Sequence, residues 1–130
     1  MAYRILIVDD STVTRMVLKK TIGMTNVPVR EIFEAGNGYE ALDSLNHHSV
    51  DLIMADINMP EMNGMEMIEE MRRDGLLETV PVVIISTEGS RTRIEELQSK
   101  GVRAYLRKPF TPEALKRVIE EILESENEEK

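Results

Sequence analysis

Several side chains that can bind metal ions or carry out nucleophilic chemistry stand directly after short apolar runs. Carboxylates follow two of these runs, a hydroxyl ends a third and a lysine follows a fourth; they are Asp9, Asp10, Asp56, Ser86 and Lys108. A short apolar run is typical of a strand buried on both faces of a parallel sheet. Ligands of such sheets bind beyond the carboxyl ends of the strands. The sequence therefore predicts that these side chains gather at one edge of a sheet.

Three carboxylates at one place repel one another, which predicts a cation among them. Two unit charges about 4 Å apart interact by about 4 kcal/mol at an effective dielectric constant of about 20. Mg²⁺ takes oxygen ligands and is often held by one or two carboxylates with phosphate oxygens, and Lys108 supplies a second positive charge. Because an aspartate can accept a phosphoryl group as an acyl phosphate, Asp56 is the candidate nucleophile. Asp9 and Asp10 are the candidate metal ligands.

Each of these residues also has a simpler interpretation. Asp56 can be a turn residue or a helix cap, as most loop aspartates are, and Asp9 and Asp10 can cap the first helix. Ser86 can be a strand-end hydroxyl without a role, and Lys108 can be a solvated surface lysine. No single one of these residues shows whether its role is structural or functional.

The elements that must position these side chains alternate along the chain. Apolar runs predict strands at residues 4–8, 29–35, 52–55, 82–86 and 104–107. Cap residues and helical spacing predict helices that begin near residues 12, 38, 65, 91 and 112. This alternation is typical of βαβ units. The predicted fold class is α/β, a doubly wound five-stranded parallel sheet flanked by five helices.

Two of the predicted helices carry apolar residues at helical spacing. In the first helix the residues at this spacing are Val13, Met16, Val17 and Lys20. In the second helix the residues expected to face inward are Tyr39, Ala41, Leu42 and Leu45.

The length of the chain predicts one domain, and its net charge argues against one class of partner. The 130 residues suffice for one core, with residues 1–124 as the domain and 125–130 as a charged tail. The formal charge of −8 argues against nucleic-acid binding, which needs a basic face.

Without cysteine there is no disulfide framework. No signal peptide and no membrane-length apolar run are found, so the expected location is the cytoplasm. The nine methionines are expected to be mainly core filler.

The ordered set Asp9-Asp10, Asp56, Ser86 and Lys108-Pro109 resembles the receiver domain of two-component response regulators, most closely the single-domain, CheY-like type. The motifs Asn-Met-Pro at residues 58–60, Asn-Gly at 63–64 and Asn-Gly-x-Glu-Ala at 37–41 support the resemblance, which covers residues 4–123. It implies a flavodoxin-like sheet of order 2-1-3-4-5, for which CheY is itself a standard example.

The resemblance also implies a role for each residue of the acidic site. Asp56 would be phosphorylated, and Lys108 would contact the phosphoryl group. Asp10, Asp56 and the backbone carbonyl of Asn58 would bind Mg²⁺, with Asp9 helping through water. These roles are carried over from the family to the matching positions of this sequence.

Four residues around the site carry further roles by resemblance. Ser86 stands at the family's hydroxyl switch position and Tyr105 at its aromatic switch position. Asn58 and Glu88 stand at positions that tune the attack of water on the phosphoryl group. Their types suggest a phosphoryl group with a short lifetime.

The function implied by the resemblance is a stand-alone signalling switch, in chemotaxis or another pathway, and not a conventional enzyme. The protein would be a monomer that takes a phosphoryl group from a sensor histidine kinase or a histidine phosphotransfer protein. It would bind its target through the fourth helix, fifth strand and fifth helix, with Arg91 and Ile94 as contacts. Motor-binding relatives carry a lysine where this chain has Val118, which weakens the case for a flagellar motor partner.

Two other classes of protein share parts of this pattern. A haloacid-dehalogenase-type phosphatase also places a nucleophilic Asp after an apolar strand, but it expects a second Asp two residues later, where this chain has Asn58. A flavin-binding doubly wound domain would need a phosphate-binding loop after the first strand. Asp9 and Asp10 at that place would repel a phosphate in the absence of a metal ion.

Overall fold

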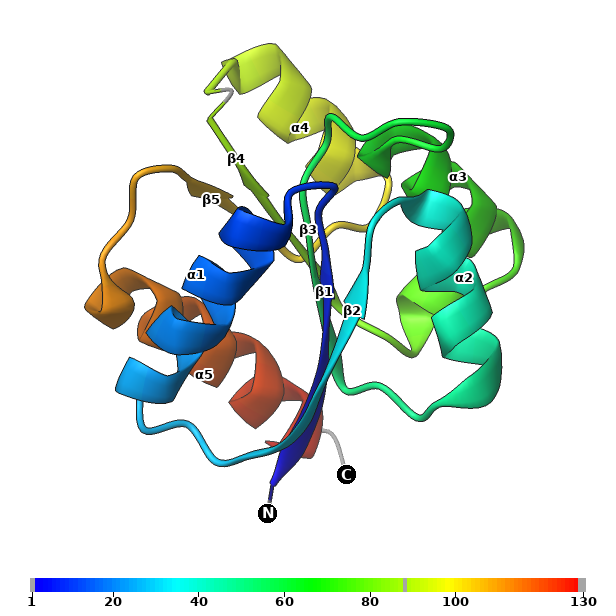
Figure 1. Cartoon of the computed structure of the whole chain (residues 1–130). Helices are drawn as coiled ribbons and strands as arrows, with labels where there is room; N and C mark the ends of the chain where they lie inside the picture. Colours follow the sequence, from blue (N-terminus) through cyan, green and yellow to red (C-terminus); the bar gives the residue numbers. More distant parts are fainter. Residues whose placement is uncertain (1, 88, 129–130) are drawn as a thin grey trace.

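The computed structural model describes residues 2–87 and 89–128, and the side chains of these residues up to Glu124. Within this part of the chain the sheet has five strands: β1 (Tyr3–Val8), β2 (Val29–Ala35), β3 (Leu52–Ala55), β4 (Val82–Ser86) and β5 (Ala104–Arg107). Neighbouring strands are parallel and the order is β2-β1-β3-β4-β5 (Figure 1). The predicted fold class and strand order are confirmed.

The described helices follow the strands in alternation: α1 (Thr12–Met24), α2 (Gly38–His47), α3 (Gly64–Arg73), α4 (Arg91–Ser99) and α5 (Pro112–Glu128), with the 3₁₀-helix η1 (Leu76–Glu78) before β4. Polar caps set where all five of these α-helices begin. In each case the side chain of the residue before the helix accepts a hydrogen bond from a first-turn N–H, as good N-caps do; these residues are Ser11, Asn37, Asn63, Ser90 and Thr111. Helix α5 runs to Glu128 and so includes part of the segment expected to be a charged tail.

The helices cover both faces of the sheet (Figure 1). One core lies between the sheet and α2, α3 and α4, and the other between the sheet and α1 and α5. Alternate residues of β3 serve the two cores: Ile53 and Ala55 face the first, Leu52 and Met54 the second. All four are buried, as expected for the central strand of a parallel sheet. Met54 and Met67 are fully buried, which confirms the core role for these methionines.

The apolar stripe expected from the spacing in α1 faces solvent instead of the core. Val13, Met16 and Val17 are among the most exposed large apolar side chains of the described chain. Leu18 and Ile22 are buried in their place. These two residues are four positions apart and form the row of α1 that packs on the sheet and α5. Two rows of α1 have helical spacing, and only one of them can face the core.

The inward position expected for Tyr39 is wrong, since 59% of this residue is exposed. The inner face of α2 begins at Gly38, which packs so closely on Met62 that a Cβ at Gly38 would overlap its side chain. The face continues through the fully buried Ala41. Tyr39 follows Gly38 directly and is turned away by the helical geometry.

Among the described helices, none has the length and apolarity needed to cross a membrane.

Candidate functional site

The carboxyl ends of β1, β3, β4 and β5 meet at one edge of the sheet, and backbone hydrogen bonds hold the residues that follow them. The N–H of Asp56 donates to the carbonyl of Val8 at 3.0 Å, and the N–H of Lys108 donates to the carbonyl of Ser86 at 2.8 Å. The N–H of Asp9 donates in the same way to the last carbonyl of β2 at 3.0 Å. The ladder thus continues one residue beyond the strands and carries the functional side chains with it.

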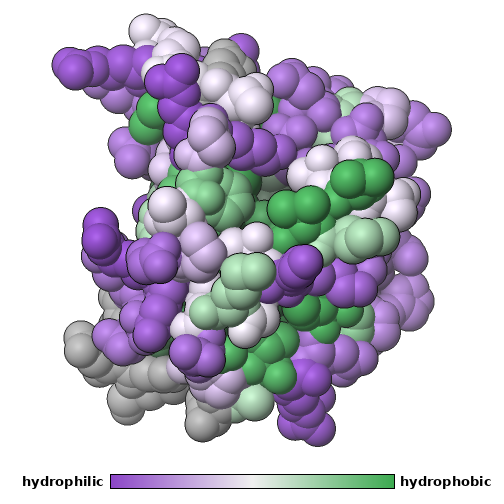
Figure 2. Space-filling model, turned by 60° about the vertical axis from the view of Figure 1, so that its left-hand side comes forward, coloured by the Kyte–Doolittle hydropathy of each residue, from purple (hydrophilic) through white to green (hydrophobic). Residues whose placement is uncertain are grey.

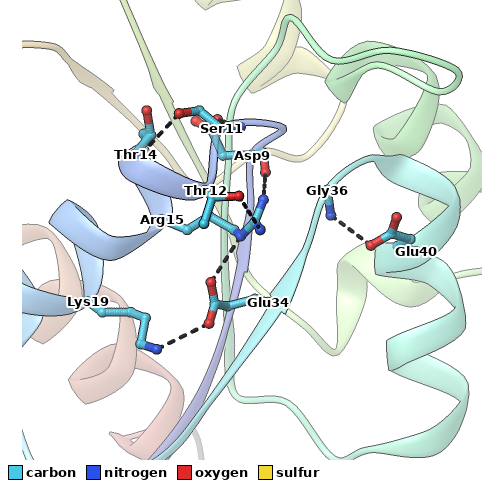
Figure 3. Close-up of polar contacts among 9 residues, drawn as sticks. All are labelled: Asp9, Ser11, Thr12, Thr14, Arg15, Lys19, Glu34, Gly36 and Glu40. Atoms are coloured by element: carbon cyan, nitrogen blue, oxygen red, sulfur yellow. Dashed lines mark hydrogen bonds and ion pairs between the residues drawn. The ribbon is translucent and has the colours of Figure 1, made fainter.

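Asp9, Asp10 and Asp56 form a cluster in which one carboxylate oxygen from each residue lies within 4.8 Å of the other two. Asp9 is buried, Asp56 is half-buried and Asp10 is exposed. Oδ1 of Asp9 accepts a hydrogen bond from the N–H of Ser11 at 2.8 Å, at the start of α1 (Figure 3). Its other oxygen lies 3.6 Å from the Lys108 ammonium. The predicted convergence of the three carboxylates and Lys108 is confirmed, and the oxygen-only donor set fits a hard divalent cation.

The environment of Asp56 favours its protonated form. Burial raises the pKa of the Asp56 carboxyl above its ordinary value, and the nearby Asp9 raises it further. The N–H of Ile57, which donates to Oδ1 of Asp56 at 2.7 Å, and the Lys108 charge oppose this shift in pKa. The Lys108 charge and the Ile57 hydrogen bond therefore offset only part of the rise in the pKa of Asp56. A cation at the cluster would lower this pKa and so favour the ionised carboxylate, the form that can act as a nucleophile.

Gly64 packs directly on the backbone of the loop that carries Asp56. A Cβ at Gly64 would overlap the carbonyl oxygen of Asp56 and lie 2.9 Å from Cα of Ile57. The N–H of Gly64 also donates to the carbonyl of Ile57 at 2.8 Å. The sequence analysis treated Asn63-Gly64 only as a supporting motif. The glycine directly after the helix cap is the feature of the sequence that could have predicted this close packing, because glycine has no Cβ.

The two expected switch residues lie on neighbouring strands. Ser86 is only 1% exposed and ends β4. Tyr105 is paired with Ile84 in the register of β4 and β5 and packs, half-buried, against the core under α2, α3 and α4. Because side chains alternate along a strand, Ser86 lies on the same face of the sheet as Ile84 and Tyr105. The switch role itself stays a prediction.

The two residues expected to tune the phosphoryl lifetime differ in how far the structure describes them. Asn58 is exposed in the loop after β3, two residues beyond Asp56. Glu88 lies outside the described residues. Their role therefore remains a prediction from the resemblance.

Comparison with known proteins agrees with this geometry. The family model for the response regulator receiver domain matches residues 5–120. The chemotaxis protein CheY of Pseudomonas aeruginosa is 37% identical over 95% of this chain and 98% of its own length. The solved structure of Vibrio cholerae CheY4 superposes with a TM-score of 0.82 at 30% identity, covering 95% of this chain and 100% of that one.

A third relative was solved with its ligands. The CheX-CheY-BeF3-Mg²⁺ complex from Borrelia burgdorferi contains a chain that matches with a TM-score of 0.79 at 25% identity, over 92% of this chain and 88% of that one. The family match spans most of the sequence and includes the carboxyl end of every described strand that leads to the acidic cluster. The chain therefore belongs to the response regulator receiver domain family.

Proposed function

We propose that this protein is a stand-alone response regulator of a two-component phosphorelay that accepts a phosphoryl group on Asp56, with chemotaxis as its pathway. The observation that carries the proposal is the cluster of Asp9, Asp10 and Asp56 opposite Lys108. The similarity to chemotaxis proteins over nearly the whole chain supports the pathway.

In the proposed reaction an oxygen of Asp56 attacks the phosphorus of a phosphohistidine. The P–N bond breaks, a P–O bond forms and the imidazole leaves. Lys108 would pair with the transferred group, and the 3.6 Å distance between its ammonium and Asp9 at the same edge supports this role. Ser86, at the end of the neighbouring strand, would donate a hydrogen bond to the phosphoryl oxygens. The protein would thus catalyse only the transfer of the phosphoryl group to its own Asp56 and the later removal of this group by water. It would not turn over a small substrate.

The proposed metal ion is Mg²⁺, held by Asp10, Asp56 and the backbone carbonyl of Asn58, with Asp9 assisting through water. The ion would neutralise the charge on the phosphoryl oxygens. The approach of three carboxylates within 4.8 Å supports such a site. The Borrelia burgdorferi relative, solved with Mg²⁺ and BeF3, supports the same assignment by similarity.

The proposed partners bind at different times. A sensor histidine kinase or a histidine phosphotransfer protein would supply the phosphoryl group, and a downstream protein would bind α4, β5 and α5 once Asp56 is phosphorylated. The CheX partner of the Borrelia burgdorferi relative supports output by protein–protein contact. Asn58 and Glu88 would set the lifetime of the signal.

The decisive experiment is labelling by acetyl phosphate with Mg²⁺, followed by mass spectrometry. One acid-labile phosphate is expected on Asp56. Asp56→Asn should abolish the label, whereas Asp74→Asn, an exposed carboxylate at the end of α3, should leave it intact. Label that persists in Asp56→Asn, or sustained hydrolysis of a small phosphate ester, would refute the assignment; the second result would instead indicate a phosphatase.

A further inference from the structure

The loop between β3 and α3 contains a residue other than glycine with a left-handed backbone. Glu61 has a φ of 66°, a conformation that residues with a side chain rarely adopt. Such a residue persists only where the surrounding structure holds it, and residues of this kind cluster at functional sites. Glu61 follows Asp56 and Asn58 in the same loop. The contacts that hold Glu61 therefore bear on the acidic site.

A buried asparagine at the start of α2 holds the Glu61 side chain. Asn37 is 7% exposed, and its Nδ2 donates to a carboxylate oxygen of Glu61 at 3.2 Å. Its Oδ1 accepts a hydrogen bond from the N–H of Glu40 at 2.9 Å, as the N-cap of α2. This second bond fixes the orientation of the amide, because only its oxygen can accept from a backbone N–H. One buried side chain thus joins the first turn of α2 to the loop after β3.

The next residue of each segment adds a second connection. The N–H of Gly38 donates to the carbonyl of Met62 at 2.9 Å, and the Gly38 backbone packs on the Met62 side chain. The start of α2 therefore lies beside the loop that joins β3 to α3 (Figure 1). Nearer to the sheet, Gly64 packs on the Asp56 carbonyl. Asn58, whose carbonyl is a proposed ligand of Mg²⁺, stands in the short segment between these two anchors.

The hydrogen bond to Asn37 is the contact that ties the Glu61 side chain to the fold. Glu61 is an exposed residue, and its carboxylate makes no ion pair with the side chains that the structure describes. A hydrogen bond between an amide and a carboxylate is stronger than one between neutral groups, because the acceptor is charged. Loss of this bond should free the Glu61 backbone to leave its left-handed conformation.

We propose that Asn37 is a positioning residue for Mg²⁺ binding and phosphoryl transfer, acting through Glu61 on the loop that contains Asn58. The inference rests on the proposed phosphorylation of Asp56. Asp56 itself is held by the strand ladder, because its N–H donates to the carbonyl of Val8. Loss of the bond between Asn37 and Glu61 should therefore leave the nucleophile in place and loosen the backbone that supplies the carbonyl ligand. The Mg²⁺ concentration at half-saturation should change more than the labelling rate at saturating Mg²⁺.

The test measures Mg²⁺ binding by amide NMR at residues 9–11 and 56–58, and the labelling of Asp56 by acetyl phosphate over a range of Mg²⁺ concentrations. Acetyl phosphate is a small donor, so the apolar side chains exposed on the α1 side of the molecule (Figure 2) add no contact with a protein donor. Asn37→Ser keeps a good N-cap but is too short to bond Glu61 as well. It should raise the half-saturating Mg²⁺ concentration by about tenfold, an effect typical of residues that orient metal ligands.

An exchange of donor and acceptor separates the hydrogen bond from the cap and from the charge. Asn37→Asp still caps α2 but sets a second carboxylate against Glu61. It should weaken Mg²⁺ binding, although the added negative charge alone would strengthen it. Glu61→Gln, combined with Asn37→Asp, supplies an amide N–H to that carboxylate and restores the net charge of the parent. The double variant should bind Mg²⁺ within about twofold of the parent.

Two further variants test the same bond from the other partner and control for stability. Glu61→Gly removes the acceptor at an exposed residue and suits the left-handed backbone, so it does not endanger the fold. It should weaken Mg²⁺ binding as Asn37→Ser does. Leu45→Ala changes a partly buried residue of the same helix, away from the loop. It should lower the melting temperature and leave the half-saturating Mg²⁺ concentration unchanged.

Three results would overturn the proposal. They are half-saturation within about twofold of the parent in both Asn37→Ser and Glu61→Gly, a double variant that binds Mg²⁺ no better than Asn37→Asp, and an equal loss of binding in Leu45→Ala. A parent protein that shows neither Mg²⁺ binding nor labelling of Asp56 would refute the proposed function and the inference with it. Normal binding and labelling in the parent, with unaffected variants, would overturn only the inference.

Discussion

The ammonium of Lys108 lies 3.6 Å from Oδ2 of Asp9, and the Asp9 side chain is the more buried partner. Lys108 thus compensates one carboxylate of a cluster that contains three. When all three are ionised, the cluster keeps an excess of negative charge. We therefore expect the site to respond to metal, to pH and to a transferred phosphoryl group.

Mg²⁺ is expected to raise the melting temperature of the protein because it binds the folded cluster only. At a hundredfold excess over its dissociation constant the gain is about 2.7 kcal/mol. Asp10→Ala should lose most of this gain, and without metal it should be at least as stable as the parent because one repelling charge is gone. Differential scanning calorimetry with Mg²⁺ or with a chelator measures both effects. Glu95→Ala, an exposed carboxylate on α4, is the control and should keep the full gain. A parent protein indifferent to Mg²⁺ would speak against a metal site.

Asp56→Asn is expected to stabilise the metal-free protein at pH 7. Burial raises the folded-state pKa of Asp56 above its ordinary value of 3.8. A raised pKa means that the carboxyl stabilises the fold fully below 3.8 and loses this contribution as pH rises through the folded-state value. The advantage of Asn should therefore be present at pH 7 and shrink as the pH falls toward 3.8.

Urea unfolding at a series of pH values, in a chelating buffer, gives the two free energies of unfolding. Asp74→Asn serves as the control, because that exposed side chain lies away from the acidic cluster at the end of α3. The raised pKa would be contradicted if Asp56→Asn had a lower free energy of unfolding than the parent at pH 7. It would also be contradicted if the advantage of Asp56→Asn over the parent grew as the pH was lowered.

Gly64→Ala is expected to destabilise the protein by about 1–3 kcal/mol and to slow acetyl phosphate labelling. The added Cβ would overlap the Asp56 carbonyl, and neither backbone can move without shifting the loop that carries Asp56. Gly23→Ala is the matched control, since a Cβ there meets nothing within 4 Å inside α1. It should stabilise the protein by about 0.5–1 kcal/mol. Equal effects of the two substitutions would rule out the close packing at Gly64.

Phosphorylation is expected to shift amide NMR signals well beyond the site, over residues 86–97 and 105–108. The added charge would draw Ser86 toward the phosphoryl group, and Tyr105 on the same face of the sheet could then move into the vacated space. Ser86→Ala should leave the labelling of Asp56 largely intact and remove the distant shifts. The switch is disproved if Ser86→Ala transmits the shifts normally, or if the parent's shifts stay within the residues that touch the phosphate.

The phosphoryl group is expected to be short-lived, and Asn58→Arg and Glu88→Arg should each slow its loss several-fold by hindering water. Loss of the acid-labile label with time measures the rate. Glu78→Arg, an exposed change in η1, should leave it unchanged. Parent-like rates in both site variants would remove the proposed tuning role.

The sequence by itself determined the strands and the residues that end them. The apolar runs before Asp9 and Asp56 are typical of strands buried on both faces of a parallel sheet, and the shorter, more polar run before Lys108 is typical of an edge strand. The common direction of these strands brings the site residues to one edge, whereas the strand order followed from the family resemblance. The cap at Ser11 likewise marked where the first helix begins, because this side chain satisfies a first-turn N–H group locally.

Tertiary structure alone decided which faces of the helices are buried and how the site charges are paired. In α1 the row through Val13 and Val17 and the row through Leu18 and Ile22 both have helical spacing, and only packing against the sheet and α5 selects the second. The burial of Asp9 against Lys108 depends in the same way on strands far apart in the sequence. Periodicity is a local property of the chain, whereas burial depends on what the rest of the fold places opposite each face.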